Sequence, residues 1–216
     1  MNGPKRPRVL LADDHRLVAE GLKSLLMAEF DLVGVVEDGR AMLEAARKLR
    51  PDVIVADITM PHLNGIDALV QLKRDDKRVR VVFLTMHPEV AYARRALEAG
   101  ALGYVLKHSA PSELIAAIRV ALDGKTWLTP AVAGEVLQDI KREPDKAGDP
   151  VASLTPRQRE ILQLLAEGLS AKEIGATLGV SARTVEFHKY QMMERLDLHT
   201  SAELVHFAIK HGIVAI

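Results

Sequence analysis

The chain has 216 residues, enough for one large domain or two ordinary ones, and 48% of them are hydrophobic, which supports buried cores. Lys and Arg together number 29, as do Asp and Glu, so net charge argues neither for nor against a nucleic-acid partner. The chain has no cysteine, which excludes disulfides, thiol chemistry and cysteine-bound metal centres. No apolar stretch approaches the length of a membrane span, so we expect a cytoplasmic protein without membrane contact.

Apolar runs rich in β-branched residues alternate with segments of helical period over the first 123 residues or so. Strands are expected at 8–12, 32–37, 53–57, 79–85 and 102–107. Helices are expected at roughly 15–29, 39–49, 65–74, 88–99 and 111–122. This alternation predicts an α/β fold with a five-stranded, doubly wound parallel sheet covered by helices on both faces.

Polar residues stand at the carboxyl ends of four of these strands. Asp13 and Asp14 follow the first, and Asp57, Thr85 and Lys107 end the third, fourth and fifth. One such residue is ordinary at the end of a strand, but ligands bind outside the carboxyl ends in doubly wound sheets, and this set is in register. Three converging carboxylates repel, and Mg²⁺ is the cation that best relieves them while also binding phosphate oxygens. One carboxylate could then accept a phosphoryl group, with Lys107 and Thr85 contacting its oxygens.

The segment after these strands changes character. A helix is expected from about 130 to 140, followed by residues 141–153, where charge, proline and glycine without apolar periodicity indicate a flexible linker. Trp127 is the only tryptophan, and we interpret it as a packing residue, with a role at an interdomain surface as the alternative.

Residues 154–216 have helical patterns throughout. Thr155, Ser170 and Thr200 each begin a capping box, and another helix starts at Ser181 after a turn at Gly179. The segments 170–178 and 181–196 have the dimensions of a helix-turn-helix, whose second helix enters the DNA major groove. On that helix we expect Val185, Met192 and Leu196 to face the core, with His188 packed beside them.

The outward face of the same helix carries Glu186 and an aromatic pair, Phe187 and Tyr190, with Arg183 and Gln191 nearby. Exposed aromatics on a helix well supplied with core residues suggest contact with a partner. Basic and acidic side chains are equal in number in residues 151–216, so we expect modest affinity of one copy for DNA and a need for dimers on two half-sites.

The strings LLADDH, VIVADITMPHLNG, VVFLTMH and GALGYVLK, in this order and spacing, resemble the receiver domain of bacterial two-component response regulators. The resemblance implies a flavodoxin-like fold with Asp57 as the phosphoacceptor. It implies that Asp14 binds Mg²⁺ directly, Asp13 largely through water, and Thr59 through its backbone carbonyl. It further implies a switch hydroxyl, a phosphate-pairing lysine and an aromatic that moves inward on activation, at Thr85, Lys107 and Tyr104. Many receivers have proline after this lysine, where this chain has His108.

The segment from Leu154 to about Ala208 resembles the LuxR-type DNA-binding domain, and both domains together resemble NarL/FixJ response regulators. The resemblance implies base contacts by Glu186, Phe187 and Tyr190, and backbone contacts near Thr184 and Lys189. Lysine or another polar residue is common where this chain has Glu186. Glutamate can accept a hydrogen bond from cytosine, and Phe187 could meet a thymine methyl group. Alternatively, Glu186 only pairs with a basic neighbour on the helix surface.

We expect a receiver domain at 7–123, a connecting helix and flexible linker at 124–150, and a DNA-binding domain at 151–216. The predicted function is that of a transcription factor, not an enzyme. A sensor histidine kinase or a small acyl phosphate would phosphorylate Asp57, and the homodimer would bind promoter DNA and contact RNA polymerase. The alternatives are a constitutive DNA-binding dimer with an unphosphorylated receiver, and a protein-binding signalling adaptor. A metal-dependent hydrolase is least favoured, because no separate general base or substrate pocket is visible.

Overall fold

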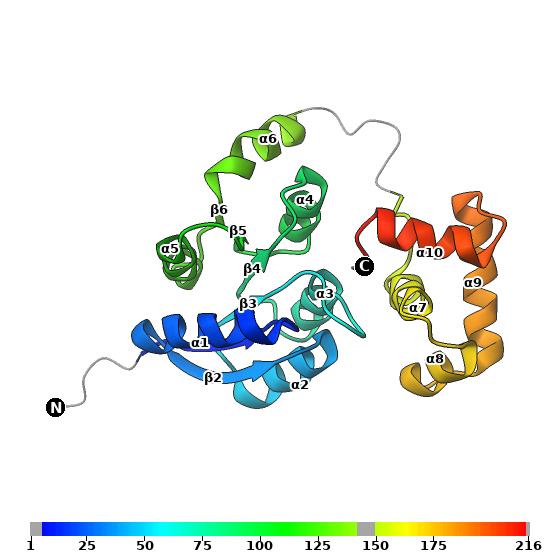
Figure 1. Ribbon diagram of the computed structural model, residues 1–216, viewed down its shortest axis with the longest axis horizontal. Helices are drawn as coiled ribbons and strands as arrows, with labels where there is room; N and C mark the ends of the chain where they lie inside the picture. Colours follow the sequence, from blue (N-terminus) through cyan, green and yellow to red (C-terminus); the bar gives the residue numbers. More distant parts are fainter. Residues whose placement is uncertain (1–5, 142–149, 215–216) are drawn as a thin grey trace.

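The computed structural model describes residues 6–141 and 150–214, which form two units (Figure 1). Most of the expected flexible linker, 142–149, lies outside the described residues. Within the described ranges, no helix is both long enough and apolar enough to cross a membrane.

The first unit is a parallel sheet with helices on both faces. Its first five strands are β1 (Arg8–Ala12), β2 (Asp31–Val36), β3 (Val53–Ala56), β4 (Val81–Thr85) and β5 (Gly103–Leu106). The helices that alternate with them are α1 (Arg16–Glu29), α2 (Gly39–Leu49), α3 (Gly65–Asp75), α4 (Val90–Glu98) and α5 (Pro111–Leu122). The strand order is β2-β1-β3-β4-β5-β6, where β6 is Trp127–Leu128, and all pairings are parallel. The predicted α/β class and strand positions are confirmed.

The prediction of five strands was one strand short. Trp127–Leu128 forms β6, which pairs in parallel with Gly103 and Tyr104 of β5. Two residues are too few for a period-two pattern, so the sequence offered no strand signal there. The helix α6 (Pro130–Lys141) follows and packs Val132 and Val136 into the core on one face of the sheet.

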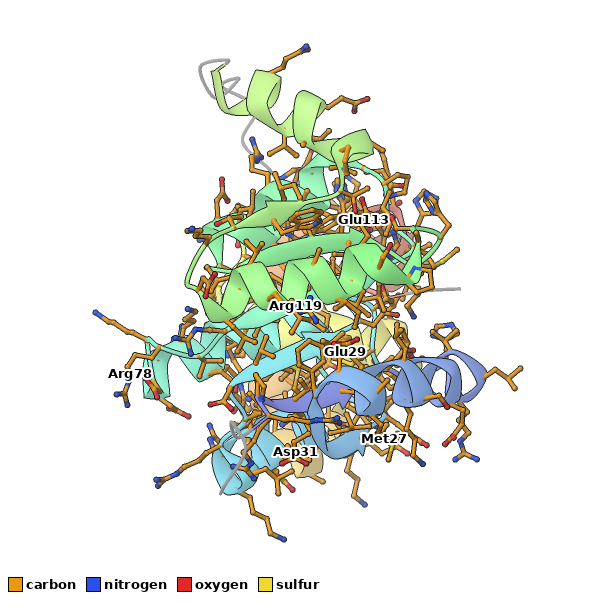
Figure 2. The ribbon with its side chains drawn as sticks, turned by 90° about the vertical axis from the view of Figure 1, so that its left-hand side faces the viewer. Met27, Glu29, Asp31, Arg78, Glu113 and Arg119 are labelled. Atoms are coloured by element: carbon orange, nitrogen blue, oxygen red, sulfur yellow. The ribbon has the colours of Figure 1, made fainter. Side chains whose placement is uncertain are left out.

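Successive strand residues point to opposite faces, which gives the sheet two cores. Val9 and Leu11 of β1 pack with α1 and α5, whereas Leu10 and Ala12 pack on the other side with α2, α3, α4 and α6. Because both faces are covered, the strands are continuous apolar runs. On the first face Arg119 of α5 reaches Glu29 of α1 at 2.7 Å (Figure 2).

The second unit consists of α7 (Pro156–Ala166), α8 (Ala171–Leu178), α9 (Ala182–Leu196) and α10 (Ser201–Lys210). The capping boxes at Thr155, Ser170 and Thr200 are all present. Gly179 has a left-handed conformation, with φ of 67°, and ends α8 before the turn into α9. Val185 and Met192 are fully buried in the core of this unit, and Leu196 packs against it. The helix α7 faces α3 of the sheet unit, while α9 lies on the side away from the sheet (Figure 1).

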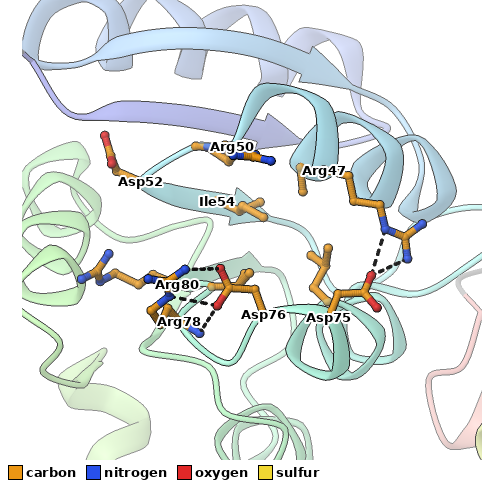
Figure 3. A pocket seen from close by; sticks show the side chains of 12 residues that line it. Arg47, Arg50, Asp52, Ile54, Asp75, Asp76, Arg78 and Arg80 are labelled. Atoms are coloured by element: carbon orange, nitrogen blue, oxygen red, sulfur yellow. Dashed lines mark hydrogen bonds and ion pairs between the residues drawn. The ribbon is translucent and has the colours of Figure 1, made fainter.

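The two ends of the sheet differ chemically. A cavity of about 870 Å³ lies at the amino end of β3 and β4, lined by residues that include Ile54 and Arg80 (Figure 3). Two arginines on its rim are already paired, Arg47 with Asp75 at 2.6 Å and Arg78 with Asp76 at 3.2 Å. The candidate functional residues lie at the opposite, carboxyl end.

Candidate functional site

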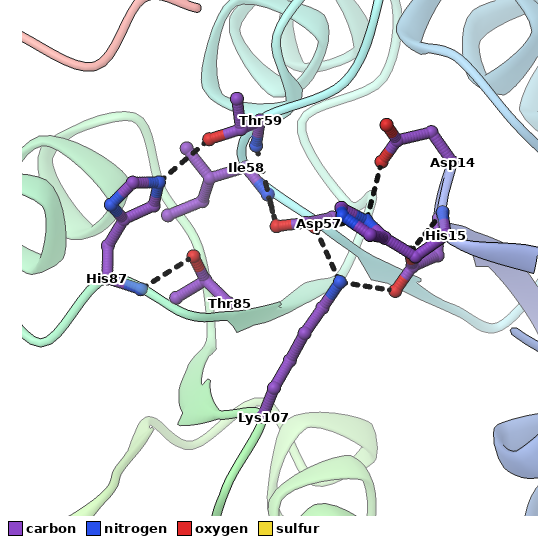
Figure 4. Close-up of polar contacts among 9 residues, drawn as sticks. Asp14, His15, Asp57, Ile58, Thr59, Thr85, His87 and Lys107 are labelled. Carbon is purple, nitrogen blue, oxygen red and sulfur yellow. Dashed lines mark hydrogen bonds and ion pairs between the residues drawn. The ribbon is translucent and has the colours of Figure 1, made fainter. Parts of the chain in front are cut away.

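Two buried carboxylates and a lysine meet at the carboxyl end of the sheet (Figure 4). Asp13 follows β1 and is 1% exposed, and Asp57 follows β3 and is 4% exposed. Lys107, after β5, places its Nζ 2.6 Å from Asp57 Oδ2 and 2.8 Å from Asp13 Oδ2. The other oxygen of Asp57 accepts a hydrogen bond from the Ile58 amide at 2.6 Å. Every strand that contributes is central in the sheet, so its backbone holds these groups rigidly in place.

The electrostatic balance at this end follows from burial. Burial raises the pKa of Asp57, and the charge of Asp13 adds to the rise, whereas Lys107 lowers it without fully offsetting burial. For Lys107, burial alone would lower the pKa, but the attraction of Asp57 and Asp13 outweighs burial and the pKa is raised. Lys107 therefore stays charged, and both buried carboxylates contact its ammonium group.

The acidic residues have the donor set for a divalent cation. One ligand atom each from Asp13, Asp14, His15 and Asp57 can be chosen so that all four lie within 4.8 Å of one another. Asp14 Oδ1 is buried and accepts no hydrogen bond within the described residues, although His15 Nδ1 lies 3.1 Å from it. Carboxylate oxygens around one point are the ligands that Mg²⁺ prefers, so these residues fit that ion.

His87 connects three residues beside the carboxylates. Its Nε2 lies 2.8 Å from the hydroxyl of Thr59, and its amide donates to the hydroxyl of Thr85 at 3.2 Å. Its carbonyl accepts a hydrogen bond from the Tyr104 hydroxyl at 2.7 Å. The Tyr104 side chain is fully buried, so the aromatic expected to move inward already lies inside.

The helix α9 presents the predicted outward residues to solvent. Phe187 and Tyr190 are 58% and 64% exposed. Glu186 pairs with Lys189 at 2.5 Å, and Lys189 Nζ lies 5.3 Å from the centre of the Tyr190 ring. Arg183 is exposed near the start of the helix. The second helix of the helix-turn-helix thus exposes an aromatic pair, with the Glu186–Lys189 ion pair beside it.

Comparison with known proteins agrees with both units. Residues 9–119 match the response regulator receiver domain, and residues 152–208 match the bacterial regulatory proteins of the luxR family. The chain belongs to the response regulators that carry a receiver domain and a luxR-type DNA-binding domain. It is 37% identical to the transcriptional regulatory protein MctR of Rhizobium johnstonii, over 96% of this chain and 95% of that protein. It is 34% identical to the response regulator UvrY of Escherichia coli, over 95% and 94%.

Solved structures of response regulators also resemble the whole chain. RcsB from Salmonella enterica serovar Typhimurium, bound to a promoter in the presence of the phosphomimetic BeF3−, matches with a TM-score of 0.62 and 27% identity. The match covers 95% of this chain and 100% of that one. The predicted family is therefore confirmed. The protein is a two-component response regulator that has a DNA-binding domain and regulates transcription. Its relatives are named as regulators and not as enzymes.

The structure brings most of the predicted receiver residues together: Asp13, Asp14, Asp57, Thr59, Thr85 and Lys107. His15 and His87 were not predicted, although each follows a predicted residue closely in the chain. Residues of α7 that contact the loop after Asp57 were not predicted either. They lie about a hundred positions away in the sequence, where helical periodicity alone assigns them to a surface.

Proposed function

We propose that this response regulator is switched by phosphorylation of Asp57 by a sensor histidine kinase or a small acyl phosphate. The observation that carries the proposal is the buried Asp57 with Lys107 at 2.6 Å. A carboxylate oxygen of Asp57 attacks the phosphorus, the new O–P bond forms as the P–N or P–O bond of the donor breaks, and the donor leaves with that electron pair. Lys107 and the Thr85 hydroxyl then hold the phosphoryl oxygens.

Mg²⁺ is the proposed cofactor. Asp14, Asp57 and the Thr59 carbonyl would hold it directly, and Asp13 largely through water. When bound, the ion neutralises charge on the transferring phosphoryl group. The Asp14 Oδ1 atom supports this assignment, because it is buried and accepts no hydrogen bond within the described residues, and a buried acceptor without a hydrogen bond is costly.

We propose that residues 7–123 act as the receiver, 124–150 as the connection and 151–216 as the DNA-binding domain. Phosphorylation would alter the surface around Thr85 and Tyr104, and through it dimerisation and promoter binding. Base contacts are assigned to Glu186, Phe187 and Tyr190, with Arg183, Thr184 and Lys189 beside the DNA backbone. The exposed aromatic pair on α9 supports the assignment. RNA polymerase is the further proposed partner, and these partners place the protein in the cytoplasm.

Intact-protein mass spectrometry tests the phosphoacceptor. The full chain is incubated with acetyl phosphate and Mg²⁺, beside an Asp57→Asn variant and a sample containing EDTA. We expect one added phosphoryl group in the wild type and none in the two controls. No added mass on a folded, magnesium-replete chain with this donor or with a phosphorylated kinase would favour a constitutive regulator.

Selection from a random duplex library tests the DNA-binding assignment. Phosphorylated and unphosphorylated protein are used in parallel, and the recovered duplexes define the half-sites and their spacing. A two-fold symmetric pair of half-sites enriched by the phosphorylated protein is expected. Recovery of no specific sequence in either form would favour a protein-binding adaptor.

A further inference from the structure

A buried glutamine lies in the contact between the two units, beside other bridging pairs such as Arg159 with Asp67 at 2.7 Å. Gln163 of α7 is 1% exposed, and its amide nitrogen donates to the Met60 carbonyl at 2.8 Å. Its amide oxygen accepts a hydrogen bond from the Asn64 amide, also at 2.8 Å. A buried side-chain amide with both ends satisfied specifies a single docking geometry, because any shift leaves a polar group unpaired.

A second residue of α7 adds hydrogen bonds to this contact. Glu167 accepts a hydrogen bond from the His62 amide at 2.9 Å and another from Gln163 at 2.8 Å. His62 has a φ of 65°, in the left-handed region that non-glycine residues adopt at an energetic cost. The DNA-binding unit therefore binds backbone groups of a strained loop, residues 58–64, and helps to hold its conformation.

This loop begins at the phosphoacceptor. The Ile58 amide donates to Asp57 Oδ1, and the Ile58 carbonyl accepts from the Gly65 amide at 2.7 Å, which closes the loop on itself. A Cβ on Gly65 would lie 2.2 Å from the Asp57 carbonyl, so the end of the loop is packed directly against the start. A backbone movement at Ile58 or Thr59 has only a few residues in which to be absorbed before it reaches Met60.

The base-reading surface takes no part in this contact. Phe187 and Tyr190 of α9 are exposed, and α9 lies on the side of the second unit away from the sheet (Figure 1). The contact thus cannot act by covering α9. Its hydrogen bonds are made instead to the loop that contains the Thr59 carbonyl and begins at Asp57.

We infer that Gln163 couples the DNA-binding unit to the metal and phosphoryl site through the loop 58–64. The inference rests on the proposed function, because it assigns the Thr59 carbonyl to Mg²⁺. Binding of Mg²⁺ at the Thr59 carbonyl changes the stability of the contact between α7 and the loop. By thermodynamic linkage, formation of that contact changes the affinity for Mg²⁺ by the same factor. The DNA-binding domain then sets the metal affinity of the receiver.

The test is calorimetric titration of the full chain with Mg²⁺. Gln163→Ala removes both bonds to the loop, and Gln163→Glu loses the donor to Met60 while keeping its size. The matched control is Gln71→Ala, which removes a 2.6 Å bond from α3 to Glu160 of α7 but leaves the loop untouched. We expect the dissociation constant to change about fivefold or more in both Gln163 variants and less than about twofold in the control.

Amide exchange provides the second readout. In the wild type the Asn64 backbone amide donates a hydrogen bond to the Gln163 side chain. This amide should lose its protection from hydrogen exchange in Gln163→Ala and keep it in Gln71→Ala. Equal dissociation constants in all four proteins would overturn the coupling while leaving the metal assignment intact. Failure of the wild type to bind Mg²⁺ would overturn the metal assignment and the coupling together.

Discussion

Replacing Lys107 with alanine removes the ammonium group that two buried carboxylates contact. Asp57 Oδ2 and Asp13 Oδ2 lie 2.6 and 2.8 Å from its Nζ, and the three side chains are at most 6% exposed. Removing one partner of a buried ion pair leaves an uncompensated buried charge and costs about 3–5 kcal/mol. Because two carboxylates lose their partner here, we expect a loss at the upper end of that range in the absence of divalent cations.

The loss should depend on pH in a defined direction. Burial already raises the pKa of Asp57 above its ordinary value of 3.8, and Lys107 is the group that opposes the rise. Without Lys107 the folded-state pKa rises further, so the penalty is absent where both states are protonated and grows as the pH rises through the folded-state pKa. The destabilisation should therefore be largest at neutral pH and shrink toward about pH 4.

Trp127 provides the assay. It is the only tryptophan, and it packs against the core of the sheet unit, so its fluorescence reports unfolding of that unit without a contribution from the DNA-binding unit. Urea unfolding with EDTA at neutral and acidic pH gives the free energies. The control is Lys48→Ala at an exposed position, expected within about 0.5 kcal/mol of wild type. A loss below about 1 kcal/mol, or one independent of pH, would refute the assumption that the pair is buried and charged.

Three further changes test other parts of the structure. Phe187→Ala should weaken binding to a selected duplex by about 1–3 kcal/mol, measured by fluorescence anisotropy, without lowering the melting temperature. Ser170→Ala removes the cap that pairs with Glu173, and should lower the stability of the DNA-binding unit by about 1 kcal/mol in a circular dichroism melt. Gly65→Ala places a Cβ 2.2 Å from the Asp57 carbonyl, so it should destabilise the receiver by about 1–3 kcal/mol and slow phosphorylation by acetyl phosphate. Wild-type values in any of these assays would contradict the corresponding contact.

The sheet and its carboxyl-end residues could be predicted because their signals are local. Continuous apolar runs predict strands covered on both faces, and parallel connection forces their carboxyl ends to one edge. Asp13, Asp57 and Lys107 are brought together by that topology alone. The capping boxes were equally predictable, since each side chain bonds a backbone amide three residues away.

Other features depend on contacts that no local pattern carries. The strand β6 exists because Trp127 and Leu128 meet an open edge of β5, and two residues show no periodicity. Gln163 is a polar residue in the middle of an amphipathic helix, where periodicity predicts exposure, yet it is buried because another unit covers it. Long-range docking overrides the local pattern at such positions.

For Glu186 the sequence left two interpretations, a contact with a base and an ion pair on the helix surface. In the free protein it pairs with Lys189 at 2.5 Å, as the surface-pair interpretation predicts. The pair is a partly exposed contact within one helix turn, and such pairs stabilise by only about 0.2–0.5 kcal/mol. A base edge and a DNA phosphate competing for the two side chains could separate them at little cost. The pair therefore does not prevent Glu186 from contacting a base.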